Sequence, residues 1–317
     1  MPESVTKKRL TNECIRNMVK KAFGCEPEHV SELTEGFFNV AYKVQLQNQT
    51  VILKVAPPDD LDVMTNEKNI MFSEVHSMQM VKRKTTVPVP EILFYDTSHT
   101  VCERNYFFMD MLEGASFSSC VEEYNEVEKY NINYEVGTYT RMLNELTNDK
   151  FGYYGQNDRQ GDCWYEVFKS MIEDTYIDAD RKGIKTAVER EQLLSLLEKN
   201  QSLFESVKKP KFVHWDIWAG NVFVNNKKVV GIIDFERCMW ADELMEYGFR
   251  SFVYEQGFYD GYGVHQLSDE QKQRAKWYDI YLFLLMCLEC DYRSYTTRDA
   301  YGWGYDGVKK LVESMES

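Results

Sequence analysis

Four polar side chains within residues 212–236 have types and spacing that suit one chemical task. They are His214, Asp216, Asn221 and Asp234. Asp216 and Asn221 bracket a short loop, so both side chains can point at one place, to which Asp234 returns after the next hairpin. Two carboxylates and an amide oxygen suit Mg²⁺, which takes hard oxygen ligands together with phosphate oxygens. The spacing predicts phosphoryl transfer, with Asp216 accepting a proton from an attacking hydroxyl and Asn221 and Asp234 holding Mg²⁺.

Short apolar strands are expected to position these side chains. Residues 212–213, 222–224 and 229–233 are apolar and are separated by turn residues, so both carboxylates stand at strand ends and can face a cleft. His214 precedes the loop, where an imidazole can brace it by hydrogen bonds. The alternative is a buried hairpin with capped turns. The pattern His-x-Asp-x₄-Asn followed by an apolar strand and Ile-Asp-Phe is more specific and favours kinase chemistry.

The N-terminal third supplies side chains that could hold a nucleotide. Gly36, Phe37 and Asn39 lie in a loop before a strand, and we predict that this loop covers the nucleotide phosphates, because glycine allows close backbone approach. With a single glycine, an ordinary β-turn is the alternative. Lys54 lies in a strand of Val, Ile and Leu, where a lysine is costly unless it is paired. It could hold the α- and β-phosphates while an acid on the next helix orients it. An edge-strand lysine that faces solvent is the alternative.

The segments HWDIWAGN (residues 214–221) and IDFE (residues 233–236) resemble the catalytic signature of the aminoglycoside phosphotransferase and choline kinase-like family. That family has a protein-kinase-like fold. Three departures separate the sequence from protein kinases: Trp218 stands where they carry Lys, Glu236 replaces the Gly of Asp-Phe-Gly, and no Ala-Pro-Glu follows. The departures point to a small-molecule acceptor.

The resemblance implies a two-lobed α+β fold. Residues 1–112 would form a small antiparallel-sheet N-terminal lobe that binds the nucleotide. Residues 113–317 would form a mainly helical C-terminal lobe for catalysis and acceptor binding. Apolar residues at helical spacing support long helices there, with loops expected at 157–162 and 178–183.

The resemblance also assigns nucleotide-binding residues. Glu74 is expected to orient Lys54, because this acid in the family lies one short helix before Val-Pro-x-Pro, here residues 87–90. Glu67 is the second choice, since the side of the helix cannot be read from the sequence. The hinge between the lobes would present backbone groups from Asp110 to Leu112 to the purine.

The acceptor is less constrained. Glu236, Asp242 and Glu246 concentrate negative charge near the expected mouth of the cleft and could bind ammonium groups of an acceptor. Asp242 and Glu246 could equally cap the next helix and pair with Arg250. The implied reaction moves the γ-phosphate of ATP or GTP to a hydroxyl of an aminoglycoside-like antibiotic. A macrolide, choline or a sugar is the alternative acceptor, and an inactive nucleotide-binding regulator is the alternative of a different class.

Composition narrows the partners. The 317 residues carry a net charge of −14, which argues against nucleic acid or an anionic membrane as a partner. The first ten residues are polar and lack the apolar core of a signal peptide, and the longest apolar run, residues 277–287, is too short to span a bilayer. Eight cysteines without framework spacing suit a reducing compartment. We expect a cytoplasmic enzyme whose partners are a nucleoside triphosphate and a small alcohol. The sequence leaves its oligomeric state open.

Overall fold

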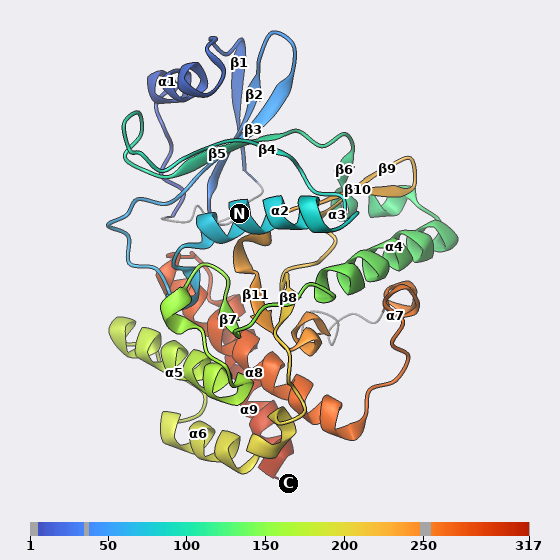
Figure 1. Cartoon of the computed structure of the whole chain (residues 1–317). Coiled ribbons are helices and arrows are strands. Elements are labelled where there is room, and N and C mark those ends of the chain that lie inside the picture. The colour runs from blue at the N-terminus through green and yellow to red at the C-terminus, as the bar shows by residue number, and fades with distance from the viewer. Residues whose placement is uncertain (1–5, 35–37, 248–254, 317) are drawn as a thin grey trace.

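The N-terminal part of the protein is built around an antiparallel sheet. The computed structural model describes residues 6–34, 38–247 and 255–316, and this part of the chain holds a five-stranded sheet in the order β1-β2-β3-β5-β4 (Figure 1). Every neighbouring pair of its strands is antiparallel. The bounds are β1 His29–Leu33, β2 Val40–Gln45, β3 Thr50–Val55, β4 Ile92–Asp96 and β5 Tyr106–Asp110.

Helix α1 (Asn12–Phe23) covers one face of this sheet. Apolar side chains alternate with polar ones along β2, so that face must be buried, and the apolar side of α1 packs on it. Thr11 caps the start of the helix, because its hydroxyl accepts a hydrogen bond from the Cys14 N–H, and Gly24 caps the end in a left-handed conformation. These contacts form a small, separate core.

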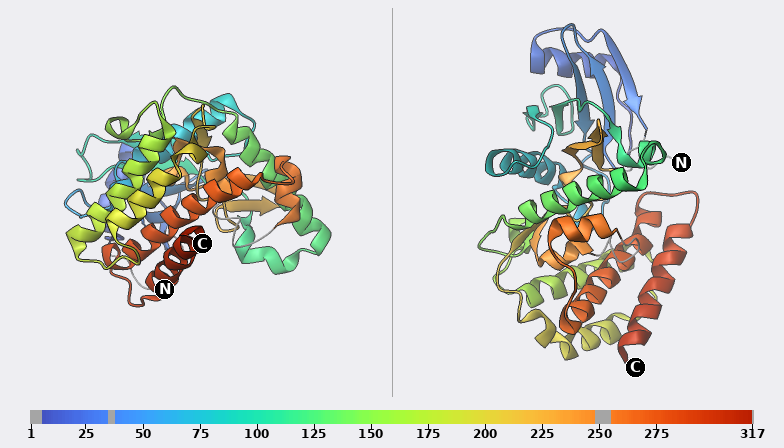
Figure 2. Two further views of the ribbon diagram at one scale, coloured as in Figure 1. Left: turned by 90° about the horizontal axis from the view of Figure 1, so that it is seen from below. Right: turned by 90° about the vertical axis from the view of Figure 1, so that its right-hand side faces the viewer.

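Helix α2 (Ile70–Lys84) lies between the sheet and the helical part of the protein (Figure 2). Its buried apolar side chains, including Met71, Val75 and Met78, belong to the large core that also fills the helical part. A single turn of 3₁₀ helix, η1 (Thr65–Glu67), precedes it. This core also includes Ile52 of β3 and Met109 of β5, so α2 packs in a core that is continuous between the sheet and the helical part.

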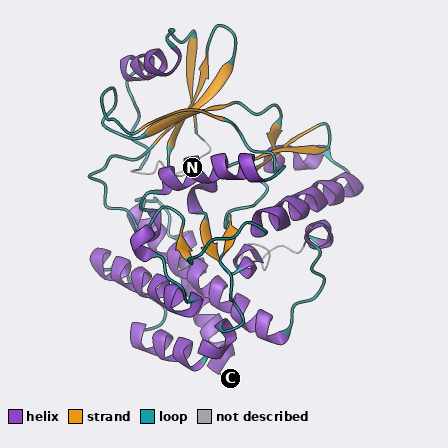
Figure 3. Ribbon diagram, in the orientation of Figure 1, coloured by secondary structure: helices purple, strands orange, loops and turns teal. Residues whose placement is uncertain are grey.

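The C-terminal part is mainly helical (Figure 3). Helix α8 packs against α5 and α9, and residues 277–290 are buried on nearly every face because they are apolar apart from Asp279 and Glu289. The α-helices are α3 Phe117–Cys120, α4 Glu126–Asn144, α5 Trp164–Lys182, α6 Arg190–Lys199, α7 Gln256–Tyr262, α8 Asp269–Tyr292 and α9 Asp299–Glu316. The short 3₁₀ helices are η2 Val121–Glu123, η3 Asn157–Arg159, η4 Gln201–Phe204, η5 Phe235–Arg237 and η6 Glu243–Tyr247.

Two small sheets in the C-terminal part lie where the two parts meet. In the described residues one has the order β10-β9-β6 and the other β7-β11-β8. Their strands are β6 Ala115–Ser116, β7 Gly152–Tyr153, β8 Lys211–Val213, β9 Val222–Asn225, β10 Lys228–Ile232 and β11 Met239–Ala241. The hairpin of β9 and β10 carries a register shift between Val229 and Gly231. A Cβ atom on Gly231 would lie 2.2 Å from the Leu112 side chain, so glycine allows the segment after β5 to pack on this hairpin.

The predicted α+β fold with an antiparallel sheet followed by a helical region is confirmed. The boundary predicted at residues 112/113 falls between β5 and β6 and stays a prediction. The loop expected at residues 178–183 was wrong: α5 continues to Lys182 and ends at Gly183, whose left-handed backbone (φ 64°) terminates the helix. The loop expected at residues 157–162 includes η3. None of the helices among the described residues is long and apolar enough to cross a membrane.

Candidate active site

His214 braces the loop that follows β8. Its side chain is fully buried. Nε2 lies 3.0 Å from the carbonyl oxygen of Ile233, and Nδ1 accepts a hydrogen bond from the Asp216 N–H at 3.1 Å. A neutral imidazole protonated on Nε2 makes both contacts, and burial lowers the pKa of His214 to about 4. The imidazole thus ties the loop of Asp216 to the end of β10.

This buried imidazole should make folding stability depend on pH. Because its pKa falls from 6.5 to about 4 on folding, the stability linked to neutral His214 is complete above pH 6.5 and is lost as the pH falls towards 4. We expect the free energy of unfolding of the wild type to drop about 3 kcal/mol more than that of His214→Gln between pH 7 and 4. Urea titrations at several pH values measure both curves. Parallel curves would contradict a buried neutral imidazole.

Asn221 and Asp216 lie in direct contact across the loop. The amide Nδ2 of Asn221 donates to the Asp216 carbonyl oxygen at 2.9 Å and to its Oδ2 at 3.1 Å. Burial raises the pKa of Asp216 to about 7, with the charge of Arg237 opposing the rise and that of Asp234 adding to it. A carboxylate with this pKa is suited to accept a proton near neutral pH.

Lys54 connects the sheet to both α2 and the end of β10. Its Nζ lies 2.5 Å from Glu74 Oε1 and also contacts Asp234 Oδ1. Burial alone would lower the pKa of Lys54, but the charges of Asp234 and Glu74 outweigh it and raise that pKa. The structure therefore pairs Lys54 with Glu74, whereas Glu67 forms an ion pair with Arg293.

Asp234 occupies a position with special backbone geometry. It follows β10 and precedes η5, with φ 61° and ψ 54°, a left-handed conformation that Asp and Asn tolerate better than most residues. The N–H of Ile233 donates to the carbonyl oxygen of Asn221 at 3.0 Å, which brings the two predicted metal ligands to one place.

The donor set fits Mg²⁺. Within the described residues, Asn221 Oδ1 and Asp234 Oδ2 have no hydrogen-bond partner, so both oxygens are available to a cation. No group of three His, Cys, Asp or Glu side chains in the described part of the chain is arranged to hold a metal ion. An amide oxygen, phosphate oxygens and water would therefore have to complete the coordination, as Mg²⁺ commonly requires.

The predicted phosphate loop is described only at its end. Gly36 and Phe37 lie outside the described residues. Asn39 is buried, and its Nδ2 donates to Glu236 Oε2 at 2.8 Å. The loop therefore reaches the residue that follows Asp234-Phe235, and Glu236 is held at the site.

The two predicted hinge residues, Asp110 and Leu112, make different contacts. The N–H of Asp110 donates to the Glu91 carbonyl oxygen, and its carboxylate accepts from the Glu91 N–H. These groups are directed at the segment leading into β4 and are occupied. Leu112 packs over Gly231 of the β9–β10 hairpin. Contact of Asp110 and Leu112 with a purine stays a prediction.

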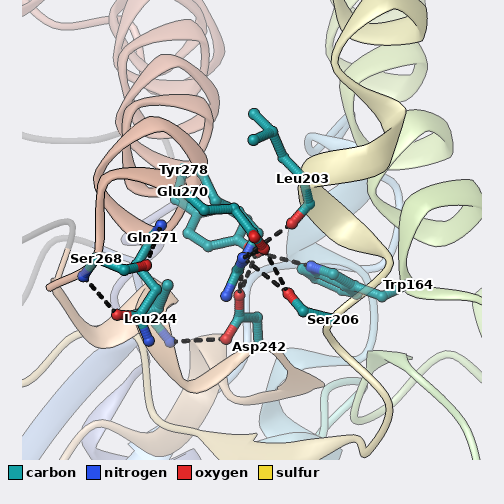
Figure 4. Close-up of polar contacts among 10 residues, drawn as sticks. Trp164, Leu203, Ser206, Asp242, Leu244, Ser268, Glu270, Gln271 and Tyr278 are labelled. Atoms are coloured by element: carbon teal, nitrogen blue, oxygen red, sulfur yellow. Dashed lines mark hydrogen bonds and ion pairs between the residues drawn. The ribbon is translucent and has the colours of Figure 1, made fainter.

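Asp242 is used inside the C-terminal core. It is 5% exposed, and its Oδ2 contacts Arg274 Nε at 2.6 Å and accepts from the Tyr278 hydroxyl at 2.7 Å. Figure 4 shows Asp242 lying between Tyr278 and the backbone N–H of Leu244. A carboxylate with these partners is not accessible to an ammonium group, so the geometry argues against the predicted acceptor role of Asp242.

Glu246 forms a hydrogen bond with the backbone of the loop that carries Asp216. It is also buried, and its Oε1 accepts from the Trp215 N–H at 2.8 Å. Trp215 has a left-handed backbone (φ 64°), and its ring stacks on Tyr281 with centroids 5.2 Å apart. The geometry therefore gives Glu246 a structural partner rather than a place in the acceptor site. The alternative partner considered for this segment, Arg250, lies outside the described residues.

Sequence reasoning did not find Arg237 and Glu289, whose charges act on Asp216, or Arg293, which contacts Glu289. Arg237 Nη2 contacts Glu289 Oε1 at 2.7 Å, and Arg293 contacts the same oxygen at 3.3 Å. Arg237 follows Ile-Asp-Phe-Glu directly, so the motif could have drawn attention to it. Glu289 and Arg293 lie at the end of α8, more than fifty residues later, and no local signal connects them to the site.

Comparison with solved structures places the fold among kinase-like phosphotransferases. A protein from Haemophilus somnus 129PT with the provisional assignment of fructosamine-3-kinase has 16% identity and a TM-score of 0.71, covering 96% of this chain and 97% of that one. A mutant of aminoglycoside phosphotransferase APH(4)-Ia, in complex with AMP-PNP and hygromycin B, has 16% identity, a TM-score of 0.67 and coverages of 95% and 98%. APH(2″)-IIa with streptomycin and ATP has 15% identity, a TM-score of 0.65 and coverages of 96% and 97%.

The sequence itself identifies the family. Residues 29–275 match the profile of the phosphotransferase enzyme family. The chain belongs to that family and is a small-molecule phosphotransferase. A comparison with curated proteins finds no match.

Proposed function

We propose that the protein transfers the γ-phosphate of ATP or GTP to a hydroxyl of an aminoglycoside-like, amine-bearing sugar compound. The observation that carries this proposal is the meeting of Lys54, Asp216, Asn221 and Asp234 at one place between the sheet and the helical part. Each of the four has the charge or ligand type that phosphoryl transfer requires.

Each side chain has one role in the proposed reaction. Asp216 accepts the proton of the attacking hydroxyl and orients that hydroxyl. Lys54, held by Glu74, binds the α- and β-phosphates. Asn221 and Asp234 would hold Mg²⁺, which neutralises charge on the phosphates when bound. Catalysis is then mainly positioning and electrostatic stabilisation in a preformed site.

The acceptor proposal depends on two side chains beside Asp216. Trp218 is 45% exposed although it is a large aromatic residue, and its ring covers Gly220 so closely that a Cβ there would lie 2.3 Å from it. An exposed indole face held in this way suits a sugar ring or an ammonium group. Glu236 adds an acid at the same site. The names of the similar structures include hygromycin B, streptomycin and fructosamine, all of which are amine-bearing sugar compounds.

A phosphotransfer screen tests the proposal. Aminoglycosides, fructosamines, a macrolide, choline and simple sugars would each be incubated with ATP or GTP and Mg²⁺, and a phosphorylated product would be detected by its mass shift. We expect amine-bearing sugars to react fastest. Faster reaction of the macrolide or choline would replace the proposed acceptor. Nucleotide binding without any turnover would favour the inactive regulator.

Antibiotic tolerance of bacteria that express the protein is a second test of the proposed acceptor. All eight cysteines are free, which suits the reducing cytoplasm where we place the reaction. If an aminoglycoside is the acceptor, expression of the protein should raise the antibiotic concentration that bacteria tolerate. Expression of the Asp216→Asn variant should not.

Replacing Trp218 should separate acceptor binding from nucleotide binding. We expect Trp218→Ala to raise the KM for the acceptor about tenfold, because a stacking or cation–π contact is lost, and to leave the KM for ATP unchanged. Steady-state kinetics with each substrate varied in turn measures both constants. Trp303→Ala is the matched control, since Trp303 is 50% exposed and lies on α9. Equal effects of the two changes on the acceptor KM would contradict a role for Trp218.

A further inference from the structure

The turn that leads into α2 is fixed to the C-terminal part at three points. Asp178 of α5 accepts from the Thr65 N–H at 2.6 Å and from the Thr65 hydroxyl at 2.9 Å. Gln156 donates to the Thr65 carbonyl oxygen at 2.9 Å. Arg293, directly after α8, contacts Glu67 Oε1 at 2.7 Å. Glu74 lies two turns further along. These contacts therefore help to fix the position of Glu74 relative to Lys54.

Arg293 is the charged member of this set and touches several elements at once. It is 4% exposed, and Nη2 contacts both Glu67 and Glu289. Nη1 donates to the Tyr295 hydroxyl at 3.2 Å. The guanidinium carbon lies 5.7 Å from the centroid of Phe38, which borders the phosphate loop. Nε has no hydrogen-bond partner in the described residues.

The same arginine is connected to the catalytic loop through Glu289. Glu289 Oε1 forms ion pairs with Nη2 of Arg293 at 3.3 Å and with Nη2 of Arg237 at 2.7 Å. The charge of Arg237 acts on the carboxylate of Asp216. Contacts thus run from Glu67 through Arg293 and Glu289 to Arg237, whose charge acts on the proposed catalytic base.

We propose that Arg293 is a positioning residue for phosphoryl transfer, which fixes the turn before α2 and Arg237 relative to each other. The inference rests on the proposed function. Its basis is geometric: a planar guanidinium can contact two carboxylates and a hydroxyl in fixed directions, and a lysine ammonium cannot reproduce that arrangement. Folding stability does not by itself account for these buried ion pairs, because a buried ion pair often contributes little net free energy of folding.

Three variants test it. Arg293→Met should lower kcat about 100-fold, since catalysis depends on placement within about 1 Å, and should change the KM for ATP less than about threefold. Its melting temperature should also fall, because Glu67 is left buried and uncompensated. The double variant Arg293→Met/Glu67→Gln removes that charge and should regain thermal stability while kcat stays low. Arg293→Lys should keep the melting temperature near that of the wild type and lower kcat about tenfold.

Arg298→Met is the matched control. Arg298 also follows α8 and pairs with an acid of that helix, Asp291, at 2.9 and 3.0 Å, but its side chain is 54% exposed. We expect kcat to stay within twofold of the wild type, because an exposed ion pair contributes little.

The outcomes separate this inference from the function itself. If kcat recovers together with the melting temperature in the double variant, or if Arg293→Lys has full activity, Arg293 has only a structural role and the inference is overturned. If the wild type phosphorylates no acceptor and does not hydrolyse ATP, the proposed function itself is wrong. Calorimetric binding of Mg²⁺–ATP to the wild type and to Arg293→Met does not depend on turnover, and similar affinities are expected.

Discussion

Replacing Asp216 by asparagine should lower kcat for phosphoryl transfer about 1,000-fold, because the variant cannot accept the proton of the attacking hydroxyl. The change is small in volume, and an asparagine oxygen can still accept the hydrogen bond that Asn221 donates to Asp216 Oδ2. The change does not alter Lys54, which we propose to bind the nucleotide phosphates. We therefore expect Mg²⁺–ATP to bind with nearly wild-type affinity, as measured by calorimetry.

The same variant should fold well. Burial raises the pKa of Asp216 to about 7, so the ionised carboxylate makes the folded state less stable as the pH rises from its ordinary pKa through 7. Asparagine removes this cost, and the melting temperature at pH 8 should equal or exceed that of the wild type. Asp158→Asn, at an exposed aspartate in η3, is the control for activity. Turnover of Asp216→Asn within tenfold of the wild type would show that another group accepts the proton.

Replacing Asp234 by asparagine should instead weaken Mg²⁺–nucleotide binding about 100-fold or more, because the metal and the phosphates lose a charged ligand. Asparagine tolerates the left-handed backbone at this position, so the change tests the charge rather than the conformation. Lys54 keeps its contact with Glu74. Alanine would be a poorer choice, since its left-handed conformation costs about 1–2 kcal/mol.

Calorimetry with ATP in the presence and absence of Mg²⁺ distinguishes the possible causes. The wild type should bind ATP much more tightly with Mg²⁺, and Asp234→Asn should show almost no difference between the two conditions. If the variant retains the full effect of Mg²⁺, Asp234 is not a metal ligand and the site must be assigned again.

The parts of the site that the sequence predicts well are local or physically costly. Asp216 and Asn221 are five residues apart, and the loop between them leaves few places for their side chains. Lys54 stands out because a lysine among apolar strand residues requires a partner, and the structure supplies Glu74 and Asp234. Short-range spacing and an unusual burial are both visible in a single sequence.

The parts that sequence reasoning missed depend on contacts between distant residues. Asp242 could not be recognised as a core residue, because its partner Arg274 lies thirty-two positions later on another element. Glu67 and Arg293 are separated by 226 positions, so the choice between Glu67 and Glu74 as the lysine partner required the folded structure. Acidic residues look alike in a sequence until their partners are known.

The packing of α2 into the large core has a consequence for product release. Glu74 lies on α2 and Lys54 lies on β3 of the sheet, so their contact joins two separate elements. If release of ADP in the proposed reaction requires these two elements to separate, the contact between Lys54 and Glu74 has to break and re-form in each turnover. The rate at which that contact opens would then be one of the steps that set kcat.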